Sequence, residues 1–347
     1  MKKVIFLSVI ALAAAVSCSK SEVVDTKFES EAIGFDTYLG RDAQTKASVE
    51  SIKTIGKVGV YGYYLGATNT FDAAAEDANL WNPLTLVINN DGTVVPPSGT
   101  DIRYWTNTTD YYTFLAYAPM DKVSVTAGTN GENPTIGYVH TNQVDVLCAE
   151  PHICRQKGNG TVDLKLEHKL ARLTVKARAE YGNFDFHIKS IVITGKFNTE
   201  GELPLASPTA WTELISVEGT QYSFQTVATD ALPKPTAKGG SVEYKDYSGT
   251  VTNGTTTTHG NNYIMLIPVL ATQHAAKLKV VYSTSYMAGD RKIESIDYEK
   301  EFPITSNFDM GMAYALALDF AQAADNAINF SVSEVGWDSQ SDITMQL

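Results

Sequence analysis

Residues 103–119 read RYWTNTTDYYTFLAYAP, the densest aromatic stretch of the chain and the one that decides its fold class. The polar segment TNTTD has the composition of a turn. The run YYTFLAYA after it combines aromatic residues with a β-branched threonine, and these residue types favour strands. Pro119 ends the run, because proline cannot donate a hydrogen bond to a strand ladder. The stretch therefore predicts a turn followed by a β-strand.

Short apolar runs between turn residues recur along the rest of the chain, and no window keeps a helical period beyond about three turns. Strands separated by turns, without helices between them, indicate antiparallel sandwiches rather than a βαβ sheet. A chain of 347 residues fits two domains of ~100–200 residues each. We therefore expect an all-β fold of two tandem antiparallel β-sandwiches, residues 18–165 and 166–347, joined near residues 160–170. Residues 84–88 and 90–94 are expected to form a hairpin with an Asp-Gly turn. The other candidate strands lie at residues 32–38, 58–64, 111–118, 143–148, 162–166, 170–177, 186–194, 222–227, 263–268, 278–285, 293–302, 313–320 and 328–335.

The first residues, MKKVIFLSVIALAAAVSCSK, have the order of a secretory signal. Lys2 and Lys3 precede an apolar run, residues 4–16, that is too short to span a bilayer. The small residues before Cys18 resemble a bacterial lipobox, in which the cysteine is acylated and becomes the first residue of the mature protein. We therefore expect residues 1–17 to be a lipoprotein signal peptide. The alternative is an ordinary signal peptide with an incidental cysteine.

Without residues 1–17 the chain carries 25 basic and 39 acidic residues, a net charge of −14. This charge argues against nucleic-acid binding, because few cations are present to neutralise a row of phosphates. No later stretch approaches the ~20 consecutive apolar residues of a membrane span. We therefore expect the lipid on Cys18 to anchor the protein to the outer membrane.

Two further cysteines, Cys148 and Cys154, flank the sequence AEPHI. In an exported protein they are candidates for a disulfide that closes this short loop. Two separate thiols are the alternative. A metal site formed by both cysteines and His152 is a third, but a fourth ligand at a recognisable spacing is missing.

Five elements of the sequence resemble the fimbrillin family, the type V pilins and their fimbrillin-like relatives. They are the lipobox leader, AIGFDTYLGR (32–41), RYW…YYTFLAYAP (103–119), LEHKLARLTV (166–175) and YALALDF…INFSVSEVGWD (314–338). The resemblance implies two transthyretin-like β-sandwich domains and a role as a structural or adhesive subunit of a cell-surface fimbrium. It implies neither an enzyme nor a cofactor. The location that it implies for the protein is the surface of the outer membrane and the fimbrium.

The family resemblance also implies a mechanism of assembly. A trypsin-like protease cuts after a basic residue and removes the first strand, and a strand from a neighbouring subunit then fills the open groove. Arg41 is the candidate cleavage residue here, with an ordinary loop arginine as the alternative. Ile33, Phe35 and Tyr38 are the side chains expected to fill the groove before cleavage.

The end of the sequence offers a candidate donor strand. After Trp337, the residues Ile343, Met345 and Leu347 alternate with polar ones. Ten residues suffice for a short donor strand, so stalk, tip and anchor roles all stay open. The partners that the resemblance implies are other fimbrial subunits, of the same or a related kind, bound by strand addition.

The other candidate function is a monomeric surface lipoprotein that binds glycans of host or bacterial surfaces. Trp81 and Trp211 lie in the polar, irregular segments NLWNPL and PTAWTEL, where their rings could stack on sugars. His168 lies inside LEHKLARL, and we expect it to form a hydrogen bond at a strand end or domain joint. No catalytic motif occurs in a fitting context, so no catalytic residue and no metal site is predicted.

Overall fold

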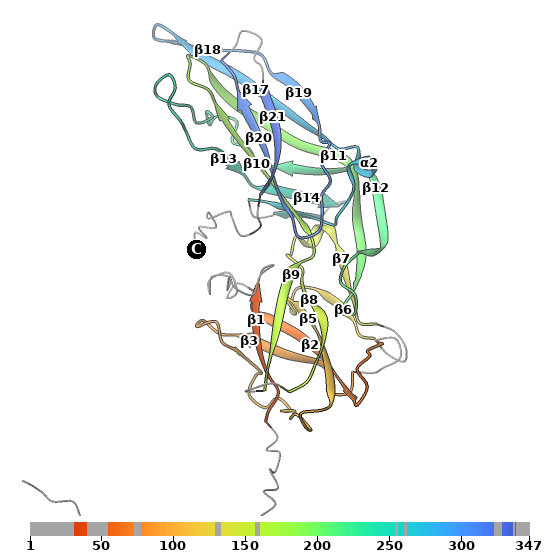
Figure 1. Cartoon of the computed structure of the whole chain (residues 1–347). Coiled ribbons are helices and arrows are strands. Elements are labelled where there is room, and N and C mark those ends of the chain that lie inside the picture. Colours follow the sequence, from red (N-terminus) through yellow and green to blue (C-terminus); the bar gives the residue numbers. More distant parts are fainter. Residues whose placement is uncertain are drawn as a thin grey trace, which may run out of the picture.

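The structure is a computed structural model, and its elements carry the labels of Figure 1. It describes residues 31–39, 55–72, 78–128, 133–156, 160–253, 256–259, 262–322, 328–335 and 337. Within these residues the regular structure is strand apart from the short helices η1 (His140–Asn142) and α2 (Ala271–His274). The predicted all-β fold is thereby confirmed. In the same residues, no helix has the length and apolar character needed to cross a membrane.

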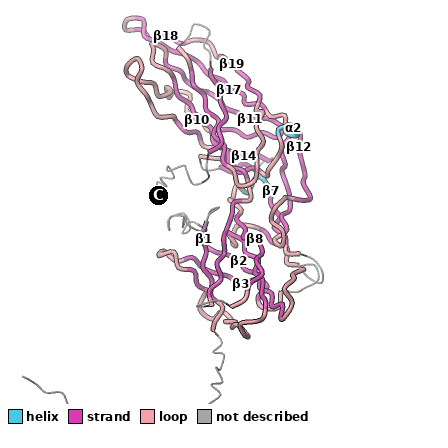
Figure 2. Tube along the Cα trace, in the orientation of Figure 1, coloured by secondary structure: helices cyan, strands magenta, loops and turns pink. Residues whose placement is uncertain are grey.

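One seven-stranded sheet forms the lower part of the molecule in Figures 1 and 2. Its strand order is β1-β9-β8-β5-β2-β3-β4, with a parallel pair only at β1 and β9. The sheet curls, so that β1 and β4 at its two ends lie near each other. The strands are β1 (Gly34–Leu39), β2 (Lys57–Gly66), β3 (Trp81–Ile88), β4 (Val94–Val95), β5 (Tyr111–Ala118), β8 (Leu147–Cys154) and β9 (Thr161–His168).

The stretch YYTFLAYA forms β5 in the middle of this sheet, as predicted. Both faces of the strand are buried. Phe114 and Ala116 pack into one apolar cluster, and Leu115 and Tyr117 pack into another on the opposite face. This two-sided burial explains why the run is continuously apolar instead of alternating with polar residues.

The upper part of the molecule is a β-sandwich of two sheets with an apolar core between them. One sheet contains β10 (Ala171–Ala179), β13 (Lys245–Tyr247), β16 (Ile264–Leu266), β20 (Ala313–Phe320) and β21 (Ile328–Val335). The other contains β6 (Ser124–Thr126), β7 (Thr135–Val139), β11 (Asp185–Pro204), β12 (Thr212–Phe224), β14 (Gly249–Asn253), β15 (Thr256–His259), β17 (Lys277–Ala288), β18 (Arg291–Glu294) and β19 (Tyr298–Pro303).

The seven-stranded sheet and the sandwich meet at an apolar cluster that we call the seam. It contains Tyr61 and Tyr117 from the lower sheet and Leu203 and Met265 from the sandwich. The predicted boundary between residues 165 and 166 falls inside β9, and the change of sheet occurs after β9 instead. β7 also leaves the lower part and pairs with β11, and β6 pairs with β7, so the first half of the chain contributes strands to the sandwich. Independent folding of the two parts stays a prediction.

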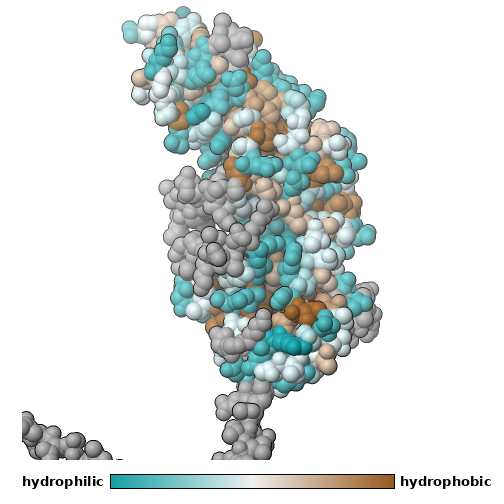
Figure 3. Space-filling view, viewed as in Figure 1, coloured by the Kyte–Doolittle hydropathy of each residue, from teal (hydrophilic) through white to brown (hydrophobic). Residues whose placement is uncertain are grey.

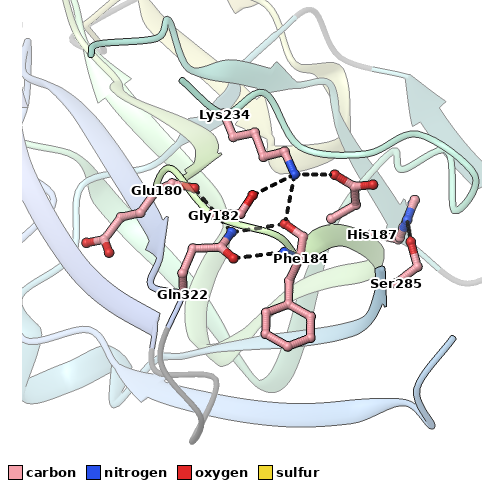
Figure 4. A network of polar contacts seen from close by, with 8 residues as sticks. Glu180, Gly182, Phe184, His187, Lys234, Ser285 and Gln322 are labelled. Carbon is pink, nitrogen blue, oxygen red and sulfur yellow. Dashed lines mark hydrogen bonds and ion pairs between the residues drawn. The ribbon is translucent and has the colours of Figure 1, made fainter. Parts of the chain in front are cut away.

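A polar network fixes the turn between β10 and β11 at the far end of the sandwich (Figure 4). The Lys234 ammonium donates to the carbonyl oxygens of Gly182, at 3.0 Å, and Phe184, at 3.3 Å. The Gln322 side chain accepts from the Phe184 N–H at 2.9 Å and donates to the carbonyl of Glu180 at 3.1 Å. These bonds satisfy backbone groups that no strand partner serves.

Candidate groove beneath the first strand

β1 is an edge strand, and among the described strands it pairs with β9 alone. The parallel register runs from Gly34 opposite Thr161 to Leu39 opposite Leu166. β9 pairs with β8 on its other side only through its last three residues, where Leu166 lies opposite Ala149. The first five residues of β9, 161–165, therefore have β1 as their one strand neighbour in the described structure.

The side chains of β1 alternate between the core and the surface, as its sequence pattern predicts. Ile33, Phe35, Thr37 and Leu39 are buried, each with 9% or less of its surface exposed. Tyr38 is only half-buried, because it lies on the opposite face from Phe35. The expectation that Tyr38 fills the groove is therefore wrong. The other buried side chains on the inner face of β1 are Thr37 and Leu39.

Phe35 is the central side chain of the groove. Its ring makes edge-on contacts with Trp81, at 5.7 Å between centroids, and with Phe114, at 5.3 Å. Ile33 and Leu39 join the same apolar cluster, to which β9 contributes Leu164 and Leu166. A small cavity of about 70 Å³ borders Ile33 and Phe35 on the side that faces β3. Removal of β1 would therefore open an apolar groove rather than a polar one.

The beginning of β1 is tied to the segment RYW. The N–H of Ile33 donates to the Arg103 carbonyl at 2.9 Å, and the N–H of Trp105 donates to the Glu31 carbonyl at 3.0 Å. The indole of Trp105 donates to the carbonyl of Gly160 at 2.9 Å. Gly160 has φ +72°, and a side chain there would meet Trp105 at 3.0 Å, so glycine is required. Sequence reasoning missed this role of Gly160.

A second depression, of about 410 Å³, lies between β8 and β9 where these strands separate. Its lining mixes charged and polar side chains, among them His152, Arg155, Asp163 and Lys165. Tyr38 also lines this depression, so the outer face of β1 borders it. Because β8 separates from β9 here, the first residues of β9 have only β1 as a hydrogen-bonded strand neighbour in the described structure.

Several predicted site residues lie outside the described residues. They are the lipidation candidate Cys18, the cleavage candidate Arg41 and the donor-strand candidates Ile343, Met345 and Leu347. Arg41 follows the last described residue of β1, Leu39, by two positions. The roles of these residues stay predictions.

Cys148 and Cys154 are not joined in a disulfide. They lie at opposite ends of β8 instead of flanking a loop, and six residues of strand span about 20 Å. A disulfide needs Cα atoms less than ~7 Å apart, so the predicted bond is wrong. Burial raises the pKa of the Cys148 thiol to about 12. In the described part of the chain, His, Cys, Asp and Glu side chains form no group of three that could hold a metal ion.

Trp81 and Trp211 do not form a sugar-binding surface. Trp81 is 8% exposed and Trp211 is 7% exposed. The Trp81 indole donates to the carbonyl of Asp101 at 3.1 Å, and the Trp211 indole donates to the carbonyl of Lys169 at 2.6 Å. Their polar sequence neighbours suggested exposure, but both rings pack into apolar clusters on either side of the seven-stranded sheet. The assignment of these two residues as glycan contacts is therefore wrong.

Truncation of Trp211 is expected to affect stability rather than ligand binding. Trp211→Ala should lower the free energy of unfolding by about 3–5 kcal/mol, because it leaves a cavity at the seam. Trp211→Phe should cost about 1–3 kcal/mol, because the Lys169 carbonyl loses its donor. Urea denaturation measures both changes. A Trp211→Ala protein of unchanged stability that lost retention on a glycan array would contradict this assignment.

His168 lies at the end of β9, where it forms a hydrogen bond as expected. Its Nδ1 donates to the Oδ2 of Asp145 at 2.7 Å. Its ring stacks on Trp337, with 4.0 Å between centroids and 22° between planes. The ring contact brings the last described residue of the chain to the seam, a proximity that no sequence pattern indicated.

One serine–histidine pair, His187 and Ser285, lies in the sandwich beside the network of Figure 4. The Nε2 of His187 lies 3.0 Å from the Oγ of Ser285. Both residues are buried, and the Nδ1 of His187 has no hydrogen-bond partner within the described structure. A catalytic triad needs an orienting acid at that nitrogen and an accessible nucleophile, so this pair fits a structural role.

The visible face of the molecule mixes hydrophilic and hydrophobic residues over both parts (Figure 3). Exposed apolar side chains occur on β12, where Leu214, Ile215 and Val217 are each 44–51% exposed. Glu213 and Glu218 flank this short stretch. Acidic residues and register shifts against β11 are features that protect a sheet edge from unwanted pairing.

A curled β-sheet that is closed by its first strand and joined to a β-sandwich defines the protein as an all-β protein of two strand-built parts. A family model described as fimbrillin-like matches residues 45–337, and the chain belongs to this fimbrillin-like family of fimbrial and cell adhesion proteins. The family that the sequence motifs resemble is thereby confirmed.

Solved structures show a similar fold over nearly the whole chain. A fimbrial protein from Bacteroides vulgatus ATCC 8482 has 17% identity and a TM-score of 0.61, covering 88% of this chain and 99% of that chain. Proposed cell adhesion proteins from Bacteroides uniformis ATCC 8492 and Bacteroides ovatus ATCC 8483 have 12% and 15% identity and TM-scores of 0.51 and 0.50. Each covers 89% of this chain, with 99% and 98% of its own length matched. No curated protein matches the sequence.

Proposed function

We propose that this protein is a structural or adhesive subunit of a cell-surface fimbrium that accepts a neighbour's strand after proteolytic removal of β1. The observation that carries the proposal is the half-paired state of β9. Its residues 161–165 have β1 as their one described strand neighbour, and the groove beneath β1 is apolar. Membership of the fimbrillin-like family supports the same role.

Loss of β1 would be energetically unfavourable unless another strand replaced it. The groove would expose the apolar surface that Ile33, Phe35 and Leu39 cover. Backbone groups of β9 would lose their hydrogen-bond partners, at about 1–3 kcal/mol for each buried group left unpaired. A strand from a partner subunit restores both contributions at once, which is the strand-addition mode of protein recognition.

The lipobox resemblance completes this proposal. Acylation of Cys18 would hold the exported precursor in the outer membrane. Cleavage after Arg41 would separate the rest of the chain from the segment that carries both the lipid and β1. One cut would therefore both release the subunit and open its groove. The proposed partners are other fimbrial subunits, and the proposed location is the outer membrane surface and the fimbrium.

The first residue of the surface-exposed mature protein tests the proposal. We expect Asp42 in protein purified from fimbriae, and lipid-modified Cys18 in precursor from cells that lack the protease. Arg41→Ala should keep the precursor uncut and absent from fimbriae. Arg41→Lys is the matched control, because a trypsin-like protease also cuts after lysine. Mature protein in fimbriae that begins at Cys18, or wild-type incorporation of Arg41→Ala, would contradict the proposed mechanism.

A further inference from the structure

Trp337, the last described residue of the chain, is held at the seam by His168 and Arg172, and Asp145 in turn holds His168. Its ring stacks on the His168 imidazole at 4.0 Å between centroids. The Arg172 guanidinium lies 5.0 Å from the Trp337 ring centroid, and its Nη2 donates to the Trp337 carbonyl oxygen at 3.0 Å. Asp145 accepts from His168 at 2.7 Å. We call these four residues the Trp337 clamp.

The clamp lies in line with the row of β9 side chains that β1 covers. Leu164, Leu166 and His168 are on one side of β9, because alternate residues of a strand point the same way. Leu166 is the last residue that pairs with β1, opposite Leu39. His168 is two residues further on, or about 7 Å along the strand. Trp337 therefore lies just beyond the end of the β1 groove along the strand, with its ring packed against the seam rather than against the cluster that β1 closes.

The direction of the chain also points toward this groove. β10 begins at the seam and runs away from it, and β20 is parallel to β10. β21 is antiparallel to β20, so it returns to the seam and ends there (Figure 1). The chain thus arrives at the clamp heading from the sandwich toward the seven-stranded sheet.

The sequence after Trp337 has the length and pattern to enter the groove. Residues 338–347 can span up to ~33–36 Å when extended, whereas the six residues of β1 span about 20 Å. Residues 338–342, DSQSD, form a polar link. Ile343, Met345 and Leu347 then recur with the spacing of two residues that Phe35, Thr37 and Leu39 show on β1.

We propose that residues 338–347 are a self-capping strand, which the Trp337 clamp directs into the β1 groove of its own chain once β1 has been removed. The capping strand would run antiparallel to β9, because it enters the groove from the end at which β1 leaves. This proposal rests on the proposed removal of β1. A tethered strand acts at an effective concentration on the order of 1 mM, so it outcompetes a free subunit at micromolar concentration. Opening of the clamp would release the strand for donation to a neighbour.

A photo-crosslinking amino acid in place of Met345 tests this proposal in the full chain. The sequence around Arg41 is replaced by a site for a specific protease, and mass spectrometry records release of the β1 peptide after cutting. At about 10 µM protein, we expect crosslinks from position 345 to residues 161–168 of the same chain, exceeding dimer crosslinks by at least tenfold. Uncut protein should give no such crosslink, because β1 occupies the groove.

Two further variants sharpen the result. The probe in place of Gln346 should crosslink to the β9 row much less, because position 346 faces the opposite side of a strand. Trp337→Ala should shift the products toward dimers, whereas Trp337→Phe keeps a stacking ring and should resemble wild type. If cut protein that has released β1 gives only dimer crosslinks, the self-capping proposal is wrong, whereas the proposed strand addition between subunits still stands. Failure of the β1 peptide to leave the cut chain would contradict the proposed function itself.

Discussion

Phe35→Asp is expected to unfold the seven-stranded sheet, with a loss of more than about 4 kcal/mol in the free energy of unfolding. Loss of a buried phenylalanine ring alone costs about 3–5 kcal/mol. The variant also places a carboxylate, without a cationic partner, against Trp81 and Phe114, and burial of an unpaired charge adds several kcal/mol. The effect is large because Phe35 lies at the centre of the cluster that β1 closes.

Urea denaturation followed by tryptophan fluorescence measures this effect, since Trp81 and Trp105 both lie in the affected cluster. Asp36→Asn is the matched control. Residue 36 lies on the exposed face of β1, and asparagine keeps the oxygen that accepts the Thr37 N–H at 2.9 Å. The control should change stability by less than about 0.5 kcal/mol. Equal stabilities of Phe35→Asp and Asp36→Asn would show that β1 does not contribute to the core.

The sequence predicted the strand pattern well because burial imposes a period of two on β1, β9 and β21. It also predicted β5 from residue type alone, although the reason for its continuous apolar run became clear only from the two clusters on its faces. Tyr38 was expected in the groove only from the family resemblance, and the strand period was not applied to it. The alternation that begins at Ile33 places Tyr38 on the other face.

The contacts that sequence reasoning missed all join residues far apart in the chain. Trp211 was expected to be exposed because its neighbours are polar, but its partner is the carbonyl of Lys169, 42 residues away. The stacking of Trp337 on His168 joins the end of the described chain to its middle. The pairing of β7 with β11 likewise joins two segments that are about 60 residues apart in the sequence. Local patterns specify strands and their faces, whereas strand partners depend on the packing of the whole chain.

The cleaved protein is expected to exchange its first strand. After a specific cut at residue 41 in a chain truncated after Trp337, which removes the proposed capping strand, β1 is held by non-covalent pairing with β9 and by its apolar side chains. Mild denaturant should release it, and the open groove should then take up a synthetic peptide of residues 31–39. Loss of Phe35 from this peptide removes its largest buried side chain. At about 3–5 kcal/mol, a Phe35→Ala peptide should bind more than about 100-fold more weakly.

Binding of the labelled 31–39 peptide to cut and uncut protein is the most direct test of the account, because the central claim is that β1 is a replaceable strand. The account predicts one peptide bound for each cut, stripped chain and none for each uncut chain. It also predicts that the bound peptide restores protection of the 161–165 amides against hydrogen exchange. A cut chain that keeps its own strand even in mild denaturant, or a stripped chain that does not bind the 31–39 peptide, would contradict the claim.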